Sequence, residues 1–314
     1  MSKLTEPRGS SSGDARAKAA VEPSDQRGSS KSGEGRGRLA VVATPIGNLG
    51  DITLRALEAL READVIACED TRVTAKLLAR YGIERPLLAY HDHNAGRVEP
   101  RLVRRMAMGE SVALVSDAGT PVVSDPGAGL VRAAIEAGIP VTVLPGPSAV
   151  LAALSVSGLP AERFLFAGFP PSRGNERRRF LAELATAPAT LILYEAPHRL
   201  AESLAEMAAV LGDRPAVVAR ELTKLHEEVR RGSLAGLARE IAEGVAPRGE
   251  IVVVVAPPSA GGAEAGTGPD LDSVLRDAMA RLSLRDAVGQ AAAITGLSRK
   301  QVYARALALQ EEST

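Results

Sequence analysis

The chain has 314 residues, of which 45% are hydrophobic, and this length predicts about two domains with an appendage. The formal net charge is zero, so a surface that binds nucleic acid must be a local patch rather than a property of the whole chain. One cysteine, Cys68, excludes an intrachain disulfide framework, the four scattered histidines predict no metal site, and no apolar run approaches the roughly 20 residues of a membrane span.

Residues 1–37 are rich in Ser, Gly, Arg and Lys and contain almost no large apolar side chains. Such a segment cannot bury enough surface to offset its chain entropy, so we expect a disordered tail. It also lacks the apolar stretch of a secretion signal, and we therefore expect a cytoplasmic protein.

From residue 38 to residue 157, short Val, Ile and Ala runs alternate with amphipathic stretches of helical length. This alternation predicts an α/β lobe with a mainly parallel sheet. The expected strands are residues 39–46, 64–68, 87–90, 111–116 and 141–144. The expected helices are residues 53–62, 71–81, 97–108, 127–137 and 148–157.

A second lobe is predicted over residues 158–257, after a break rich in Gly and Pro. Two of its strands, 216–221 and 227–232, follow each other without room for a helix, which indicates a hairpin and a mixed sheet. The other expected strands are residues 164–169, 190–194 and 250–255. The expected helices are residues 176–187, 198–211 and 234–243.

The C-terminal part begins with a Pro/Gly/Ala linker at residues 258–269. Residues 270–314 then show helical spacing of apolar side chains, with Ser283 and Asp286 placed as a capping box. This pattern predicts a small helical module that is similar to a helix-turn-helix.

Ligands of open α/β sheets bind beyond the carboxyl ends of the strands, so the loops there are the candidate site. The first is ATPIGNLGD (43–51), in which Asp51 or Thr53 can cap the next helix. The second is CEDTR (68–72). If Asp70 or Thr71 caps a helix there, Glu69 and Arg72 are left beside the ligand position.

The segment SDAGTPVVSDPG (116–127) is the most informative of these loops. Gly119 permits backbone angles closed to other residues, and two prolines stiffen the loop, so its backbone N–H groups suit a carboxylate or an adenine edge. The chain has no Gly-Lys-Ser/Thr phosphate loop and no complete dinucleotide fingerprint, which weighs against a kinase or a dehydrogenase.

Three further segments carry candidate chemistry. LPGPSA (144–149) forms a rigid turn into a helix, and YEAPHR (194–199) gathers a phenol, a carboxylate, an imidazole and a guanidinium. A third segment places Arg177, Arg178 and Arg179 in the first turn of a helix, where cations oppose the helix dipole. The arginine cluster therefore predicts phosphate binding.

Five of these loops, in this order and spacing, resemble the tetrapyrrole-methylase-like superfamily of S-adenosylmethionine enzymes: ATPIGNLGD, EDTR, SDAGTPVVSDPG, LPGPSA and YEAPHR. Within that superfamily they are most similar to the branch that methylates the 2′-hydroxyl of a cytidine in 16S ribosomal RNA. The resemblance covers about residues 39–257 and extends more weakly to the helical tail.

The resemblance implies two α/β lobes, S-adenosyl-L-methionine held in the cleft between them, and a homodimer. It also implies which residues contact the cofactor. These are Pro45, Ser116, Asp117, Ala118, Gly119, Thr120, Pro121, Pro145, Gly146 and Tyr194.

Related methylases of this fold act on corrinoid or precorrin macrocycles, so the fold alone does not choose the substrate. The GNLGDIT loop together with the EDTR and YEAPHR motifs favours ribosomal RNA, as do the arginine cluster and the tail with Arg299 and Lys300. A macrocycle methylase and a non-catalytic RNA-binding protein on the same fold remain the alternatives.

A ribose 2′-hydroxyl is a poor nucleophile until it loses its proton, and a carboxylate positioned by a cation can accept that proton. The hypothesis from the sequence is that Asp70, Asp51 or Glu195 is the acceptor, oriented by Arg72 or Arg199. All three acids are expected at strand ends that face the cleft.

Overall fold

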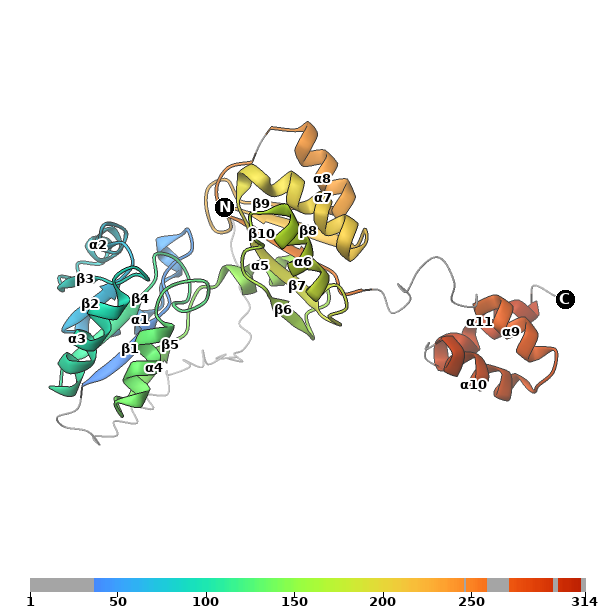
Figure 1. Ribbon diagram of the computed structural model, residues 1–314, viewed down its shortest axis with the longest axis horizontal. Coiled ribbons are helices and arrows are strands. Elements are labelled where there is room, and N and C mark those ends of the chain that lie inside the picture. The colour runs from blue at the N-terminus through green and yellow to red at the C-terminus, as the bar shows by residue number, and fades with distance from the viewer. Residues whose placement is uncertain (1–36, 246, 259–270, 296–298, 312–314) are drawn as a thin grey trace, which may run out of the picture. The chain divides into compact units, whose positions relative to one another are not determined.

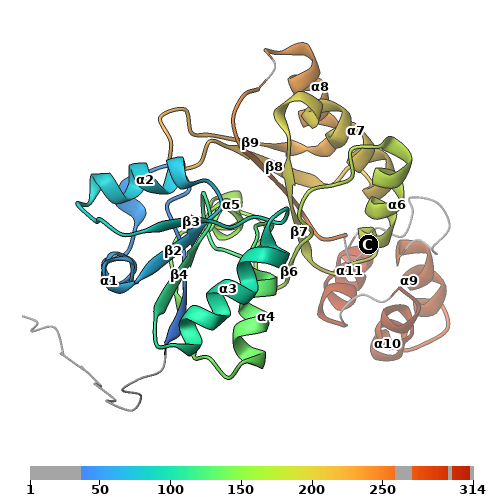
Figure 2. The same cartoon turned by 60° about the vertical axis from the view of Figure 1, so that its left-hand side comes forward.

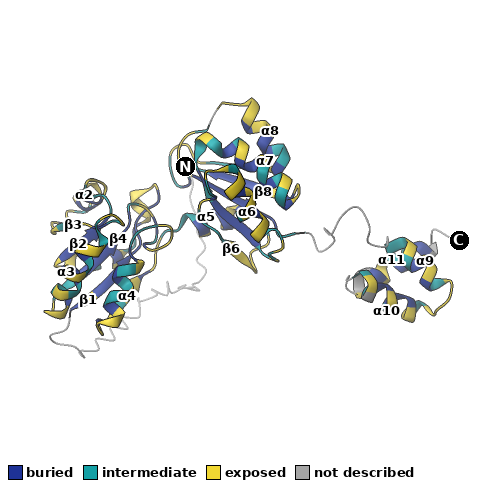
Figure 3. Ribbon diagram, viewed as in Figure 1, coloured by how far each residue is buried: buried dark blue, intermediate teal, exposed yellow. Residues whose placement is uncertain are grey.

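The computed structural model describes residues 37–245, 247–258, 271–295 and 299–311. The predicted tail at residues 1–37 and the predicted linker at 258–269 lie almost wholly outside the described residues. In the described part, two five-stranded sheets are each covered by helices, and the inner strands of both sheets are buried (Figures 1 and 3). The predicted α/β class, with a parallel first sheet and a mixed second sheet, is confirmed.

The first sheet is entirely parallel and has the strand order β3-β2-β4-β1-β5. Its three central strands, β1, β2 and β4, are buried on both faces, which is why they read as continuous apolar runs. Their bounds are β1 Arg38–Val42, β2 Val65–Cys68, β3 Leu87–Ala89, β4 Ser111–Val115 and β5 Val141–Leu144.

Two helices cover each face of this sheet. Helices α1 (Leu54–Glu62) and α2 (Thr71–Arg80) pack on one face, where Cys68 is buried. Helices α3 (Ala95–Ala107) and α4 (Ala128–Glu136) lie side by side on the other face (Figure 2). The chain leaves the sheet at Val42 rather than at residue 46 as predicted, because Thr44 pairs with Gly119 instead of a neighbouring strand.

Helix α5 (Ala149–Ser157) leads to the second sheet, which has the order β6-β7-β10-β8-β9. The predicted hairpin of β8 and β9 is present and antiparallel. Helix α5 covers one face, and α6 (Gly174–Leu184), α7 (Leu200–Leu211) and α8 (Leu234–Glu243) cover the other. The strands are β6 Phe164–Phe166, β7 Thr190–Glu195, β8 Pro215–Arg220, β9 Glu228–Ser233 and β10 Ile251–Val255.

The C-terminal helices are α9 (Leu271–Met279), α10 (Leu284–Thr295) and α11 (Arg299–Glu311), and they share a small core of their own. The predicted cap at the start of α10 is present, since the Ser283 hydroxyl accepts a hydrogen bond from the Asp286 backbone N–H. Among the described helices, none combines the length and the apolar character needed to cross a bilayer.

Candidate functional site

The loop after β4 is fixed by contacts with the loop after β1. Thr44 and Gly119 exchange two backbone hydrogen bonds of 2.8 and 3.0 Å, and the Thr44 hydroxyl donates to the carbonyl oxygen of Ser116 at 3.0 Å. Gly119 has a φ of +86°, which explains why glycine stands here. The hydroxyl of Thr120 donates to the carbonyl oxygen of Pro147, so the loop after β5 holds it from a second side.

The next part of the same loop has a strained backbone. Val122 and Ser124 have φ angles of +78° and +61°, a region that non-glycine residues, and β-branched ones above all, rarely adopt. Such strain is typical of ligand-binding segments, where the surrounding structure enforces it. The strain therefore indicates that the loop binds a ligand and does not only connect β4 to α4.

A cavity of about 330 Å³ opens on this loop. Its wall combines the loops of the first sheet with residues of β7, β10 and β8, the inner strands of the second sheet, so both lobes are needed to form it. The lining residues are Ile46, Ala118, Gly119, Thr120, Val123, Ser124, Asp125, Ser148, Ala149, Phe169, Tyr194, Glu195, Ala196, Pro197, Ala219, Leu222, Gly249, Glu250, Ile251 and Val252.

The wall of the cavity contains aromatic and aliphatic side chains together with acidic ones. The rings of Phe169 and Tyr194 lie 5.2 Å apart, next to the strands β8 and β10. Burial, followed by repulsion from Glu69, raises the pKa of Asp125 to about 6. Burial also raises the pKa of Tyr194 to about 12, with a contribution from Asp125, so its phenol stays protonated at neutral pH. A flat ring with a cationic group attached suits this set of side chains.

Four of the ten residues predicted to contact a cofactor line the cavity: Ala118, Gly119, Thr120 and Tyr194. The other six are not part of its wall, and several of them support it. Ser116 is buried and donates a hydrogen bond to the Gly119 carbonyl oxygen, and the carboxylate of Asp117 accepts the backbone N–H of Asp70. The remaining four are Pro45, Pro121, Pro145 and Gly146.

Apart from Tyr194 and Glu195, the wall from the second lobe was not predicted from the sequence. Ala219, Leu222 and Val252 read as ordinary core residues, because nothing in a strand pattern distinguishes a core position from a ligand wall. Asp125 and Phe169 stand in Gly- and Pro-rich loops, and that context was the one available clue to their position.

A second hollow, of about 490 Å³, lies at the carboxyl ends of the first sheet. It is lined by Glu69, Asp70, Thr71, Arg72, Ala89, His91, His93 and Asp117. Asp117 belongs to this hollow and its neighbour Ala118 to the first cavity, so the two spaces meet at the loop after β4. Among the described residues, no three His, Cys, Asp or Glu side chains are grouped as ligands of a metal ion.

The three predicted proton acceptors are dispersed. Asp51 lies in the exposed 3-10 turn η1 (Leu49–Asp51) and lines neither space, and Thr53 rather than Asp51 caps α1. Asp70 caps α2 through the backbone N–H of Arg72, and the Arg72 guanidinium also donates to its carboxylate. These hydrogen bonds lower the pKa of Asp70 to about 2, which makes it a weak base.

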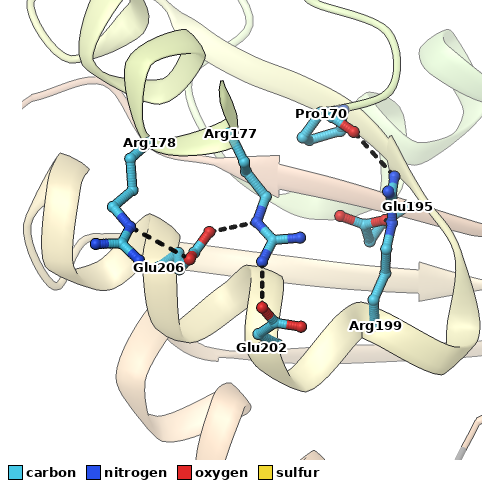
Figure 4. A network of polar contacts seen from close by, with 7 residues as sticks. All are labelled: Pro170, Arg177, Arg178, Glu195, Arg199, Glu202 and Glu206. Carbon is cyan, nitrogen blue, oxygen red and sulfur yellow. Dashed lines mark hydrogen bonds and ion pairs between the residues drawn. The ribbon is translucent and has the colours of Figure 1, made fainter. Parts of the chain in front are cut away.

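The third acid, Glu195, is buried and accepts hydrogen bonds from Arg199 at 2.5 Å and from the backbone N–H of Ala196. Arg199 also donates to the carbonyl oxygen of Pro170 (Figure 4). Glu195 lines the first cavity, and its Oε2 atom is buried without a hydrogen-bond partner in the described structure. The pair of Glu195 and Arg199 holds two loops together, and the assignment of Glu195 as a proton acceptor stays a prediction.

The predicted exposed arginine cluster on α6 is wrong for Arg177. Its side chain is 1% exposed and forms ion pairs with Glu206 and, at 2.5 Å, with Glu202 of α7 (Figure 4). The hydrogen bond to Glu206 raises the pKa of Arg177, as expected for a cation locked between carboxylates. Arg177 is thus a cross-link between two helices and is not available to a phosphate.

The other predicted RNA contacts stay predictions. Arg178 and Arg179 are 62% and 87% exposed and make long ion pairs, of 3.5 Å to Glu206 and 3.7 Å to Glu183. Arg299 is exposed at the start of α11, and the side chain of Lys300 lies outside the described part of the structure.

The two sheets and the cavity at their loops define a class of two-lobed methylases. Residues 38–238 match the family described as Tetrapyrrole (Corrin/Porphyrin) Methylases, and residues 265–310 match the RsmI C-terminal HTH domain. The chain belongs to the tetrapyrrole methylase family, in the group of the small-subunit ribosomal RNA methyltransferases I.

That grouping rests on relatives that align along most of their length. The "Ribosomal RNA small subunit methyltransferase I" of Mesorhizobium japonicum is 52% identical over 88% of this chain and 93% of its own. The protein of the same name from Xylella fastidiosa is 51% identical over 85% of this chain and 98% of its own. The predicted family and the predicted class of methyltransferase are confirmed.

Solved structures agree with the fold. The uroporphyrin-III-C-methyltransferase of Thermus thermophilus is 26% identical, with a TM-score of 0.50, and covers 70% of this chain and 94% of its own. A diphthine synthase has a TM-score of 0.54 at 20% identity and covers 69% of this chain and 89% of its own. Both matches cover about 70% of this chain and show the same fold.

Proposed function

We propose that this protein transfers a methyl group from S-adenosyl-L-methionine to the ribose 2′-hydroxyl of a cytidine in 16S ribosomal RNA. The observation that carries the proposal is the extent of the likeness to small-subunit ribosomal RNA methyltransferases, which includes the C-terminal helices as well as both lobes. Macrocycle methylation is the alternative, since the uroporphyrin methylase shares the two lobes.

The first cavity suits S-adenosyl-L-methionine. The cofactor supplies a methyl group on a positively charged sulfur. The rings of Phe169 and Tyr194 offer a stacking surface for adenine, and the backbone N–H of Thr120 can donate to a polar edge, whereas that of Gly119 is bonded to Thr44. The carboxylates of Asp125 and Glu250 would attract the positive charge on the sulfur of the cofactor.

The proposed substrate is a polymer, and its contacts reach beyond the cavity. Arg178 and Arg179 on α6 and Arg299 and Lys300 on α11 are the proposed contacts to phosphate. We place the acceptor RNA within the small ribosomal subunit in the cytoplasm, and we propose that the enzyme acts as a homodimer, as the family resemblance implies.

The test is methyl transfer from labelled cofactor to small ribosomal subunits purified from cells that lack the protein. Nucleoside analysis of the product is expected to recover the label as 2′-O-methylcytidine. Label in a porphyrinoid or corrinoid precursor offered in parallel would support the macrocycle alternative. If calorimetry detects no binding of the cofactor, the chain is a non-catalytic RNA-binding protein.

A matched pair of variants ties this activity to the cavity. Ala118→Phe places a ring in the cavity wall, whereas Ala137→Phe adds the same ring to an exposed position after α4. We expect the first variant to lose cofactor binding and methyl transfer together and the second to keep both. Equal activity of the two variants would assign the cofactor to another place.

A further inference from the structure

We propose that Glu69 is the group that accepts the proton of the 2′-hydroxyl, and that the second hollow holds the acceptor ribose. This inference rests on the proposed function and assigns the proton transfer to a residue outside the three acids predicted from the sequence. The position of Glu69, its free carboxylate and the groups around it support this assignment.

The position of Glu69 is set by the fold. It follows the buried strand β2 directly and precedes Asp70, the cap of α2, so its backbone is fixed on both sides. Its side chain lines the second hollow. Because Asp117 and Ala118 are consecutive and line the two spaces, a ribose in the hollow and a methyl donor in the cavity meet at one short stretch of backbone.

The carboxylate of Glu69 also acts close to the cofactor cavity. It is the largest charged contributor to the raised pKa of Asp125, which lines that cavity. Repulsion between two carboxylates weakens with the distance between them. Of the two acids of the hollow that raise the pKa of Asp125, Glu69 contributes more than Asp117, and Asp125 lies in the cavity where the methyl group is proposed to be.

The neighbouring acids are occupied by structural bonds. Asp70 is held by the Arg72 guanidinium, with distances of 2.6 to 3.1 Å. Asp117 accepts the backbone N–H of Asp70 at 3.0 Å. In the described part of the chain, no hydrogen bond or ion pair reaches the carboxylate of Glu69, so its oxygens are open to a substrate hydroxyl.

The electrostatics suit a proton acceptor. Burial raises the pKa of Glu69, and the charges of Asp117, Asp92 and Asp70 raise it further, while His91 acts in the opposite direction. A carboxylate with a raised pKa binds a proton more tightly and is a stronger base. The two carboxyl groups of the hollow therefore differ in base strength. Hydrogen bonds lower the pKa of Asp70, and burial raises the pKa of Glu69.

His91 adds a hydrogen-bond donor beside Glu69. The amide of Asn94 is oriented by the backbone N–H of His91 and the carbonyl oxygen of Ala89, so its nitrogen faces His91 Nε2 at 3.2 Å. An imidazole that accepts at Nε2 carries its proton on Nδ1. Nδ1 is buried without a hydrogen-bond partner in the described structure.

In the proposed step, the 2′-oxygen bonds to the methyl carbon while the bond between that carbon and sulfur breaks. The electron pair of the broken bond stays on sulfur and neutralises its positive charge. The proton of the hydroxyl passes to a carboxylate oxygen of Glu69, which later releases it to water. One methyl group and one proton are thus transferred, and no further reactant is needed.

The experiment compares Glu69→Gln with Glu84→Gln, a matched change at an exposed position before β3. We expect Glu69→Gln to lower single-turnover methyl transfer by about 10²- to 10⁴-fold, the usual contribution of a positioned acid–base group. Glu84→Gln should keep the wild-type rate. Calorimetric affinities for S-adenosylhomocysteine and for the RNA should stay within about twofold in both variants, since the proton acceptor adds little ground-state binding.

The pH profile supplies a second readout. The wild-type rate should rise tenfold per pH unit while Glu69 titrates and then level off, whereas Glu69→Gln should lose this limb. Glu69→Asp, which keeps a carboxylate, should restore the limb with a lower plateau. Unfolding midpoints within about 2 °C of wild type identify the variants as folded; if Glu69→Gln is unfolded, the Glu69→Asp profile decides alone.

The proposal is overturned if Glu69→Gln keeps the wild-type rate and profile, or if its loss is explained by weaker binding of the cofactor or the RNA. In those cases wild-type protein still forms 2′-O-methylcytidine, so the proposed function stands. If wild-type protein forms none, both proposals are wrong.

Discussion

At the scale of single residues, the cofactor cavity contains a carboxyl group, that of Asp125, whose ionisation is disfavoured. Asp125 has its pKa raised to about 6, mainly by burial and then by Glu69. In the unfolded chain the same group titrates near pH 4. The folded state thus holds the proton to a higher pH, and the stabilisation present below pH 4 is lost as the pH rises through 6.

Asp125→Asn removes this titration, so the variant should gain stability relative to wild type between pH 4 and pH 7. The side chain is only half buried, and after allowance for solvent screening we expect a relative gain of about 1 kcal/mol. Denaturant unfolding at a series of pH values measures it, with the exposed Asp277→Asn as the control. Parallel curves for Asp125→Asn and wild type would contradict this account of the raised pKa.

At the scale of elements, the start of α4 depends on a glycine for two reasons. Gly127 has a φ of +137°, and a Cβ atom there would lie 2.8 Å from Leu114 Cδ2 on β4. The first reason is a backbone conformation that side chains disfavour, and the second is a lack of space. Gly127 therefore lets the strained cofactor loop join the helix while it packs against the sheet.

Gly127→Ala should destabilise the protein by about 2 to 3 kcal/mol, because strain and overpacking add. Gly138→Ala is the control, since Gly138 has a φ of +67° with no atom within 4 Å of the added Cβ. It should lose about 1 kcal/mol, from backbone strain alone. Equal losses in the two variants would show that the space beside Leu114 is not limiting.

The elements themselves were largely predictable. Buried strands such as β4 and β10 are continuous apolar runs, and the helices between them begin at caps such as Thr53 and Ser233, which accept hydrogen bonds from the third helical residue. The errors lie at element ends. β1 stops before the predicted end, because the residues that follow it pair with the loop after β4, and such a pairing leaves no mark on local periodicity.

The candidate site was less predictable than the fold. One part of the cavity wall, which contains Gly119 and Thr120, was predictable from the sequence of its loop. Glycine and proline at the end of a strand indicate a tight turn, and neighbouring residues alone are enough to recognise it. The partners of Arg177 stand 25 and 29 residues further along the chain, so its burial depends on how α6 and α7 pack. A local reading of three consecutive arginines could not separate the buried one from its exposed neighbours.

At the scale of the whole molecule, the lobes and the C-terminal helices are separate hydrophobic cores. The four core clusters of the two lobes contain no residue beyond Val255, and α9 to α11 share a fifth cluster. Folding of the lobes and of the cofactor cavity should therefore not require the C-terminal helices. The proposed binding of RNA should require them.

Removal of residues 259–314 should leave the cofactor affinity within about twofold of that of the full chain, because no lining residue of the cavity is lost. The same truncation should weaken binding of a 16S RNA fragment, measured by fluorescence anisotropy from 50 to 200 mM salt. If Arg299 and Lys300 each neutralise one phosphate, the slope of log affinity against log salt should become shallower by about 1 to 2.

The exposed arginines of α6 can be tested in the same assay. Arg178→Ala combined with Arg179→Ala should reduce the salt slope by about 2 more, while the exposed Arg85→Ala, on the first lobe, should leave it unchanged. A slope that the truncation does not alter would mean that the C-terminal helices make no phosphate contact. In that outcome the lobes alone would hold the RNA, and the α6 pair would have to account for the whole electrostatic part of binding.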